Sequence, residues 1–434
     1  MADVTVMKTA AETALADLFA RSKSLLPGDA RSREDAFHRF AEKGLPHRRV
    51  EEWKYTDLRA LMREVAPLAE KPSEADVAQA LSVESVFAAA KPATLAFVNG
   101  HLAKADAMPD GVTAVPLAQA LAEGHPLLAK LGAVSDAEGN AAYALNAAFM
   151  TDGVVLHVTG KVAERVQLRF VTTGAEPVAT ATRVLVVVEA DAALSLLETH
   201  ESPNGVAHQP NGVVEFVVGD RAAVSHVRLN ANGDRALSLS TVTAHLGSEV
   251  AFGTRNVVAG SAVSRHQVWM TFAGPDSKGS VRGATMLSGD QHADTTLVVN
   301  HKATGCESRE LFKHAVDGRA TGVFQGRINV APGAQKTDGK MMSAAVLLSE
   351  EGTMNNKPEL EIFADDVQCA HGATCGQLDD DLLFYLMARG LPRPEAEALL
   401  IESFLGEAVE EGLDDEVVGE ALMGVIGAWL KARG

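Results

Sequence analysis

The sequence contains few cysteines, few aromatic residues and no excess of positive charge, and each shortage excludes a class of protein. Only three cysteines occur in 434 residues, too few for a disulfide framework. Aromatic residues make up 5% of the chain, few for an enzyme that binds sugars on aromatic platforms. The formal net charge is −18, whereas phosphate recognition needs a clustered cationic surface, so nucleic acid is not expected as a main partner.

Long apolar runs and nucleotide-binding motifs are also missing. No stretch of 18 or more apolar residues occurs, and the N-terminus does not have the pattern of a secretory signal, so no membrane association is expected. With so few cysteines, a cytoplasmic protein is expected. The chain has no G-x-x-x-x-G-K-[ST] loop, so it is not expected to hydrolyse ATP, and it has no G-x-S-x-G nucleophile motif.

Three regions differ in their residue pattern and predict three domains, at residues 1–150, 151–370 and 371–434. The first region is helical and mixed. Its stretch SREDAFHRFAEKGLP predicts a helix that Ser32 caps and that Gly44 ends. The stretch LAFVNGHLA predicts a hairpin with Asn99 and Gly100 in the turn.

The middle region predicts a mainly β fold, a parallel β-helix or β-solenoid. Short runs rich in valine, leucine and threonine alternate with small or polar breakers, many of them about 28 residues apart. A near-constant step of this length is typical of stacked coils. A β-sandwich is the alternative, but sandwiches place turns every 8–12 residues.

The last region predicts helices with apolar stripes. One stripe consists of Ala398, Ile401, Leu405 and Ala408. Such helices can cap the open strand edges at the solenoid end, or they can form a docking surface. Composition favours the cap.

Cys369, His371 and Cys375 form a C-x-H-x3-C spacing between an apolar run and a helix. Thiolate and imidazole are ligands that zinc, copper and iron prefer, and on a strand Cys369 and His371 point to the same face. No second metal-ligand pair of a known spacing occurs, so any further ligands must come from elsewhere. Alternatively, the cysteines act as small apolar residues and His371 lies in a turn. Cys306 is the third thiol, and nearby cationic residues would lower its pKa, although a cysteine without a role is the simpler interpretation.

Three stretches resemble one known family. This family is the SufB/SufD family of the SUF iron–sulfur cluster assembly machinery. Its C-terminal signature is similar to KPELEIFADDVQCAHGATCGQLDDDLLFYLMARGL, and its N-terminal signature is similar to RRVEEWKYTDLRAL. The start of its β-helix is similar to ALNAAFMTDGVVLHV. The absence of cysteine before residue 306 resembles SufD more than its paralogue SufB, which remains the alternative within the family.

The resemblance implies a non-enzymatic scaffold subunit with a right-handed parallel β-helix between helical domains. It implies a heterodimer with SufB through the β-helix, binding of the ATPase SufC through the C-terminal helices, and a homodimer when the chain is isolated. The family's metal-binding histidine and its preceding cysteine fall on His371 and Cys369. These residues would meet a transient iron–sulfur cluster shared with SufB. Cys375 departs from the family pattern.

Two other functions stay open from the residues alone. A carbohydrate-active solenoid enzyme would use the same fold but needs more aromatic residues. A purely structural solenoid would need neither His371 nor Cys369.

Overall fold

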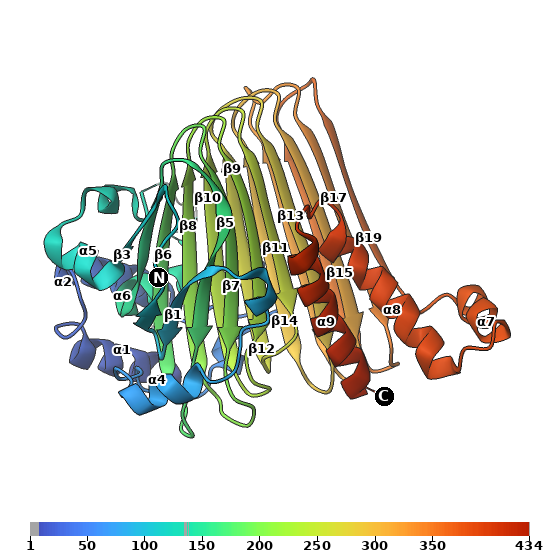
Figure 1. The fold of residues 1–434 in the computed structure, drawn as a ribbon, viewed down its shortest axis with the longest axis horizontal. Coiled ribbons are helices and arrows are strands. Elements are labelled where there is room, and N and C mark those ends of the chain that lie inside the picture. Colours follow the sequence, from blue (N-terminus) through green and yellow to red (C-terminus); the bar gives the residue numbers. More distant parts are fainter. Residues whose placement is uncertain (1–7, 134–136, 138, 434) are drawn as a thin grey trace, which may run out of the picture.

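Two sheets of mostly parallel strands form a β-solenoid, with helices at both ends of the chain (Figure 1). The structure, a computed structural model, describes residues 8–133, 137 and 139–433. Successive strands of one sheet begin at residues 193, 223, 251, 278, 307, 338 and 368, so a coil takes 27 to 31 residues. The predicted solenoid and its step are therefore confirmed, and the sandwich alternative is wrong.

The chain alternates between the two sheets. Sheet A contains, in spatial order, β18 (Thr353–Ile362), β16 (Thr321–Val330), β14 (His292–His301), β12 (Val263–Phe272), β10 (Leu237–Leu246), β8 (Gln209–Val218), β6 (Ala179–Val188), β4 (Asp152–Val158) and β3 (Val112–Pro116). Sheet B contains β19 (Gln368–Gly376), β17 (Asp338–Leu347), β15 (Glu307–Val316), β13 (Lys278–Leu287), β11 (Ala251–Val258), β9 (Ala223–Ala231), β7 (Ala193–Glu201), β5 (Lys161–Val171), β1 (Ala93–Val98) and β2 (His101–Ala105).

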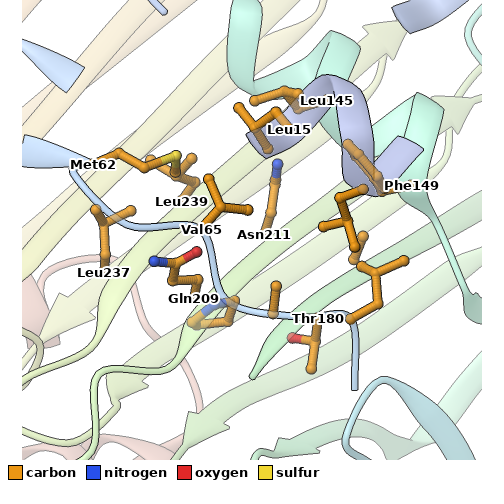
Figure 2. Close-up of a pocket in the computed structure, with 15 residues that line it drawn as sticks. Leu15, Met62, Val65, Leu145, Phe149, Thr180, Gln209, Asn211, Leu237 and Leu239 are labelled. Atoms are coloured by element: carbon orange, nitrogen blue, oxygen red, sulfur yellow. The ribbon is translucent and has the colours of Figure 1, made fainter. Parts of the chain in front are cut away.

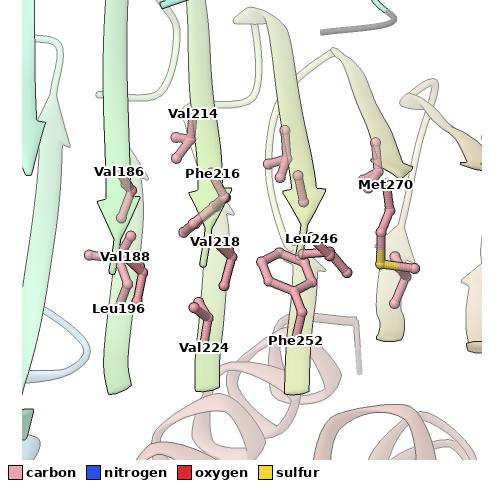
Figure 3. Packing of buried hydrophobic residues seen from close by; sticks show 14 of the residues in the cluster. Val186, Val188, Leu196, Val214, Phe216, Val218, Val224, Leu246, Phe252 and Met270 are labelled. Atoms are coloured by element: carbon pink, nitrogen blue, oxygen red, sulfur yellow. The ribbon is translucent and has the colours of Figure 1, made fainter. Parts of the chain in front are cut away.

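Apolar side chains of both sheets fill much of the solenoid lumen. Because strand side chains alternate, every second residue points inward. In-register pairing then places apolar side chains of neighbouring strands next to one another. For example, Val186 of β6 lies beside Phe216 of β8 (Figure 3). Met270 on β12 extends the same column and is fully buried. Each buried side chain of this size contributes roughly 1.5–3 kcal/mol of transfer free energy.

Other inward positions carry a buried polar network. Glu198 of β7 accepts hydrogen bonds from His226 at 2.9 Å and from Arg228 at 3.1 Å, both on β9, and also contacts His200. These bonds hold the pKa of Glu198 well below its usual range although burial alone would raise it. The network compensates the cost of burying charge inside the solenoid.

The N-terminal region consists of short elements on the outside of the solenoid. Its helices are α1 (Ala10–Ser22), α2 (Ala30–Lys43), η1 (Glu51–Trp53), α3 (Leu58–Leu61), α4 (Glu74–Ala80), η2 (Ala88–Ala90), α5 (Leu117–Glu123), η3 (Pro126–Lys130) and α6 (Ala141–Phe149). The predicted helix exists as α2, but its N-cap is Asp29, whose carboxylate accepts from the backbone N–H of Ser32 at 2.9 Å. The prediction that Ser32 caps this helix was therefore wrong, because the helix begins earlier in the chain.

The predicted hairpin is confirmed. Strands β1 and β2 pair antiparallel with Val98 opposite His101. Asn99 and Gly100 both have positive φ, at 50° and 78°, the conformation that a tight two-residue turn requires.

The C-terminal helices α8 (Arg393–Glu410) and α9 (Glu416–Arg433) pack on the outer face of sheet B, while α7 (Asp380–Ala388) projects away from it (Figure 1). Ile401, Leu405 and Leu422 are fully buried in this contact. Arg282 of β13 pairs with Glu411 at 2.8 Å, and Lys313 of β15 pairs with Glu407 at 2.8 Å. The helices cover a side of the solenoid, so the expectation that they cap its end was wrong.

Strand β19 runs to Gly376 and α7 begins at Asp380. The last strand therefore passes beyond residue 370, where the sequence pattern placed the end of the solenoid. The division into domains at 1–150, 151–370 and 371–434 stays a prediction.

Candidate functional site

The candidate site lies on the last coil, at the open end of the solenoid. Strands β18 and β19 are the outermost strands of sheets A and B. Each pairs on one side only, with β16 and β17 respectively, and their residues are mostly exposed or half-buried. The backbone groups on the other edge are available for pairing with another chain.

Cys369 and His371 both lie on β19, two residues apart. In the ladder, Cys369 pairs with Gly339 and His371 pairs with Met341, and Met341 belongs to the apolar core of the lumen. Both residues therefore continue inward-facing columns of the solenoid and share one face, as the strand alternation predicts. Cys369 is half-buried and packs against the lumen core, whereas His371 is exposed.

The two other thiols differ from Cys369 in their surroundings. Cys375 is exposed, and Cys306 is fully buried, with its Sγ 3.4 Å from the carbonyl oxygen of Gly274. Burial raises the pKa of all three thiols. The prediction that cationic neighbours lower the pKa of Cys306 was therefore wrong, because desolvation of the thiol has the larger effect.

The open end does not hold a complete set of metal ligands. Among the residues that the structure describes, no three histidine, cysteine, aspartate or glutamate side chains are close enough to hold a metal ion. Cys369 and His371 thus offer two donors of the kind that iron accepts, at a surface that another chain can reach.

Sequence reasoning missed Glu310, which lies in the same column as His371. Glu310 on β15 pairs with Met341 on β17, which in turn pairs with His371. The Glu310 side chain is buried, and neither carboxylate oxygen has a hydrogen-bond partner. Burial raises the pKa of Glu310 to about 8. The alternation Ser308, Glu310, Phe312 was the signal that could have revealed an inward-facing acid.

An apolar pocket lies elsewhere, between α1, α6 and the outer face of sheet A (Figure 2). Leu15, Met62 and Phe149 line it, together with the amides of Gln209 and Asn211. No lining residue is titratable. The pocket therefore carries no set of groups for catalysis or metal binding.

The fold is that of a β-solenoid protein flanked by helices, and sequence comparison gives its family. Residues 170–404 match the profile "SUF system FeS cluster assembly, SufBD core domain", and residues 9–168 match "SufBD protein N-terminal region". The chain therefore belongs to the SufBD family.

Individual relatives agree with this assignment. The chain is 32% identical over 386 residues to an iron–sulfur cluster assembly SufBD family protein of Synechocystis, covering 85% of this chain and 84% of that protein. It is 29% identical over 400 residues to the iron–sulfur cluster assembly protein SufD of Escherichia coli, covering 88% of this chain and 90% of that one. The Bacillus subtilis SufD protein is 28% identical over 293 residues, 65% of each chain.

No helix in the described part of the chain is both long enough and apolar enough to cross a membrane.

Proposed function

We propose that this chain is a non-enzymatic scaffold subunit of a cytoplasmic SUF complex, in which it pairs with SufB and binds the ATPase SufC. In this proposal, the open end of the solenoid joins a SufB subunit, and Cys369 and His371 contribute part of a ligand set for iron or a nascent iron–sulfur cluster. The cluster is cargo, and the remaining ligands come from SufB. The relatives of this chain in Escherichia coli and Bacillus subtilis are both named iron–sulfur cluster assembly protein SufD, which supports this role.

The observation that carries the proposal is the position of His371. It is exposed on the edge strand β19, on the same face as Cys369, in a part of the chain that supplies no third ligand of its own. A metal held by two protein ligands is incompletely coordinated, so a partner at this edge would complete the site.

Anaerobic cluster reconstitution with SufB and SufC tests the proposal. His371→Ala should leave the complex assembled on a sizing column but strongly reduce its iron–sulfur absorption. His38→Ala is the matched control, because His38 is also exposed but lies on α2, far along the chain. A normal cluster yield with His371→Ala would contradict the ligand role.

The sequence predicts SufC binding through the C-terminal helices, and among these helices we propose α7 as the docking surface. The apolar stripe on α8 that the sequence suggested for docking is covered by sheet B, whereas Leu382, Phe384 and Tyr385 on α7 are exposed. Phe384 is 74% exposed. An exposed apolar patch of this kind is typical of an interaction site.

Substitution of one α7 residue tests this surface. Phe384→Asp should abolish co-purification of SufC without lowering the melting temperature. Val83→Asp, at a similarly exposed valine outside the C-terminal region, should retain SufC. Retention of SufC by Phe384→Asp would exclude α7 as the docking surface.

A further inference from the structure

A cleft of about 510 Å³ lies between the N-terminal region and the outer face of sheet A. Residues from β12, β14 and β16 form its floor, and residues between Lys43 and Trp53 form one wall. Its volume is within the range of about 300–1,000 Å³ that is usual for small-molecule sites. It lies on the outer face of the solenoid and shares no residue with the Cys369–His371 site.

Two polar atoms in this cleft have no hydrogen-bond partner. They are Nε of Arg327 and Oδ1 of Asn329, both buried. The two residues are two apart on β16, so their side chains share the outer face. Buried polar atoms without partners are costly and rare, and here one of the two is a donor and the other an acceptor.

The neighbours of these atoms do not satisfy them. The closest carboxylate contacts of Arg327, to Glu359 and Glu361, are 3.7 and 3.8 Å long, beyond hydrogen-bond distance. Asn329 uses its amide nitrogen to donate to Asn300 at 2.8 Å, which leaves its oxygen facing no donor. A ligand that fits both atoms has an anionic acceptor next to a hydrogen-bond donor.

The charge and ring content of the lining specify the ligand further. Lys43, Lys302 and Arg327 line the cleft together with Glu52, and the carboxylates of Glu359 and Glu361 lie 3.7 and 3.8 Å from Arg327. The three cationic side chains are hydrogen-bond donors of the kind that bind phosphate. Trp269 is half-buried and lines the cleft, so its indole offers a face for ring stacking.

We propose that this cleft binds a small phosphorylated molecule with a planar heteroaromatic ring, of the nucleotide type. Arg327 and Lys43 hold the phosphate, Trp269 stacks on the ring, and Asn329 accepts a hydrogen bond from it. This site is separate from the proposed assembly function and does not depend on it.

Calorimetric titration of the full-length chain with ADP tests the proposal, with adenosine and pyrophosphate as ligands that lack the phosphate or the ring. ADP should bind at least tenfold more tightly than either. Arg327→Gln and Trp269→Leu should each weaken ADP binding about tenfold, the effect of one lost charged hydrogen bond or stacking contact. Trp269→Phe should largely restore it. Arg319→Gln removes the same charge at an exposed solenoid turn and should bind ADP normally.

Three results would overturn the proposal. One is the absence of saturable ADP binding up to about 1 mM, the weak end of specific recognition. Another is pyrophosphate binding as tightly as ADP, which would exclude a role for the ring. The third is unchanged ADP affinity in Asn329→Asp, which keeps the packing but places a negative charge beside Arg327. Melting temperatures of all variants identify any that fail to fold.

Discussion

Glu310 shows how a single residue can depart from the pattern of its neighbours. Its column in the lumen holds Val281 before it and Met341 after it, both buried and apolar. A carboxyl group in such surroundings keeps its proton at neutral pH. The residue therefore makes the stability of the chain depend on pH.

Glu310→Gln should remove this dependence. The carboxyl has a pKa near 4.5 when unfolded and about 8 when folded, so between these values the folded chain binds the extra proton. Stability is then highest at low pH and falls as the pH rises towards 8, by at most about 1.4 kcal/mol per pH unit. In urea titrations, the variant should gain stability relative to wild type from pH 5 to pH 8.

Glu307→Gln is the control for this experiment. Glu307 lies on the same strand but on the outer face, where it pairs with Lys278 at 3.2 Å. Its pH profile should follow that of wild type. Parallel profiles for wild type and Glu310→Gln would show that Glu310 is ionised in the folded chain.

At the scale of elements, the N-terminal signature acts as an anchor on the solenoid. The ring of Trp53 lies 3.7 Å from the guanidinium carbon of Arg265 on β12, and Arg265 donates to the carbonyl oxygen of Glu52 at 2.7 Å. Arg265 also pairs with Asp294 on β14, and both side chains are fully buried.

Arg265→Met should destabilise the chain by about 3–5 kcal/mol, because it leaves the Asp294 carboxylate buried without its cation. The free energy of unfolding in urea measures this effect. Arg319→Met breaks a pair with Asp290 at 2.8 Å that is exposed on a turn, and should cost less than about 1 kcal/mol. Equal effects of the two substitutions would show that burial of the Arg265 pair does not matter.

The sequence predicted elements well where local signals were strong. It did not predict which part of the chain packs against an apolar face. The coil step followed from breakers between strand-forming runs, and the turn followed from the Asn99–Gly100 pair, because both residue types tolerate positive φ. The stripe containing Ile401 and Leu405 was visible, but an apolar stripe does not specify what it packs against. Its contact with sheet B joins residues far apart in the chain, which periodicity cannot reveal. The same holds for the site: strand alternation predicted that Cys369 and His371 share a face, but not that Glu310 lies below them.

At the scale of the whole molecule, the open end of the solenoid exposes apolar residues. Ile362 and Phe363 lie at the end of β18, and Phe363 is 67% exposed. An unpaired strand with apolar residues beside it favours addition of strands from another chain. Under the proposed function this partner is SufB, and for the isolated chain we propose a second copy.

The double substitution Ile362→Lys and Phe363→Lys should therefore weaken association at this end at least tenfold while leaving the melting temperature unchanged. Light scattering on the isolated chain and co-purification with SufB measure the two kinds of association. Leu25→Lys introduces the same charge at an exposed apolar residue near the N-terminus, and should associate normally. Unchanged association of the double variant would place the interface elsewhere.

The attachment of α8 and α9 to sheet B has a mechanical consequence. Arg282 and Lys313 join the C-terminal end of α8 to two neighbouring coils, and in-register hydrogen bonds join those coils to β19. A push on the helices from a partner that changes shape cannot be absorbed by bending within so regular a stack. The solenoid would instead rotate as one rigid body, and the terminal face that carries His371 would move with it. This motion would change the distance between His371 and any group that a partner holds at this face.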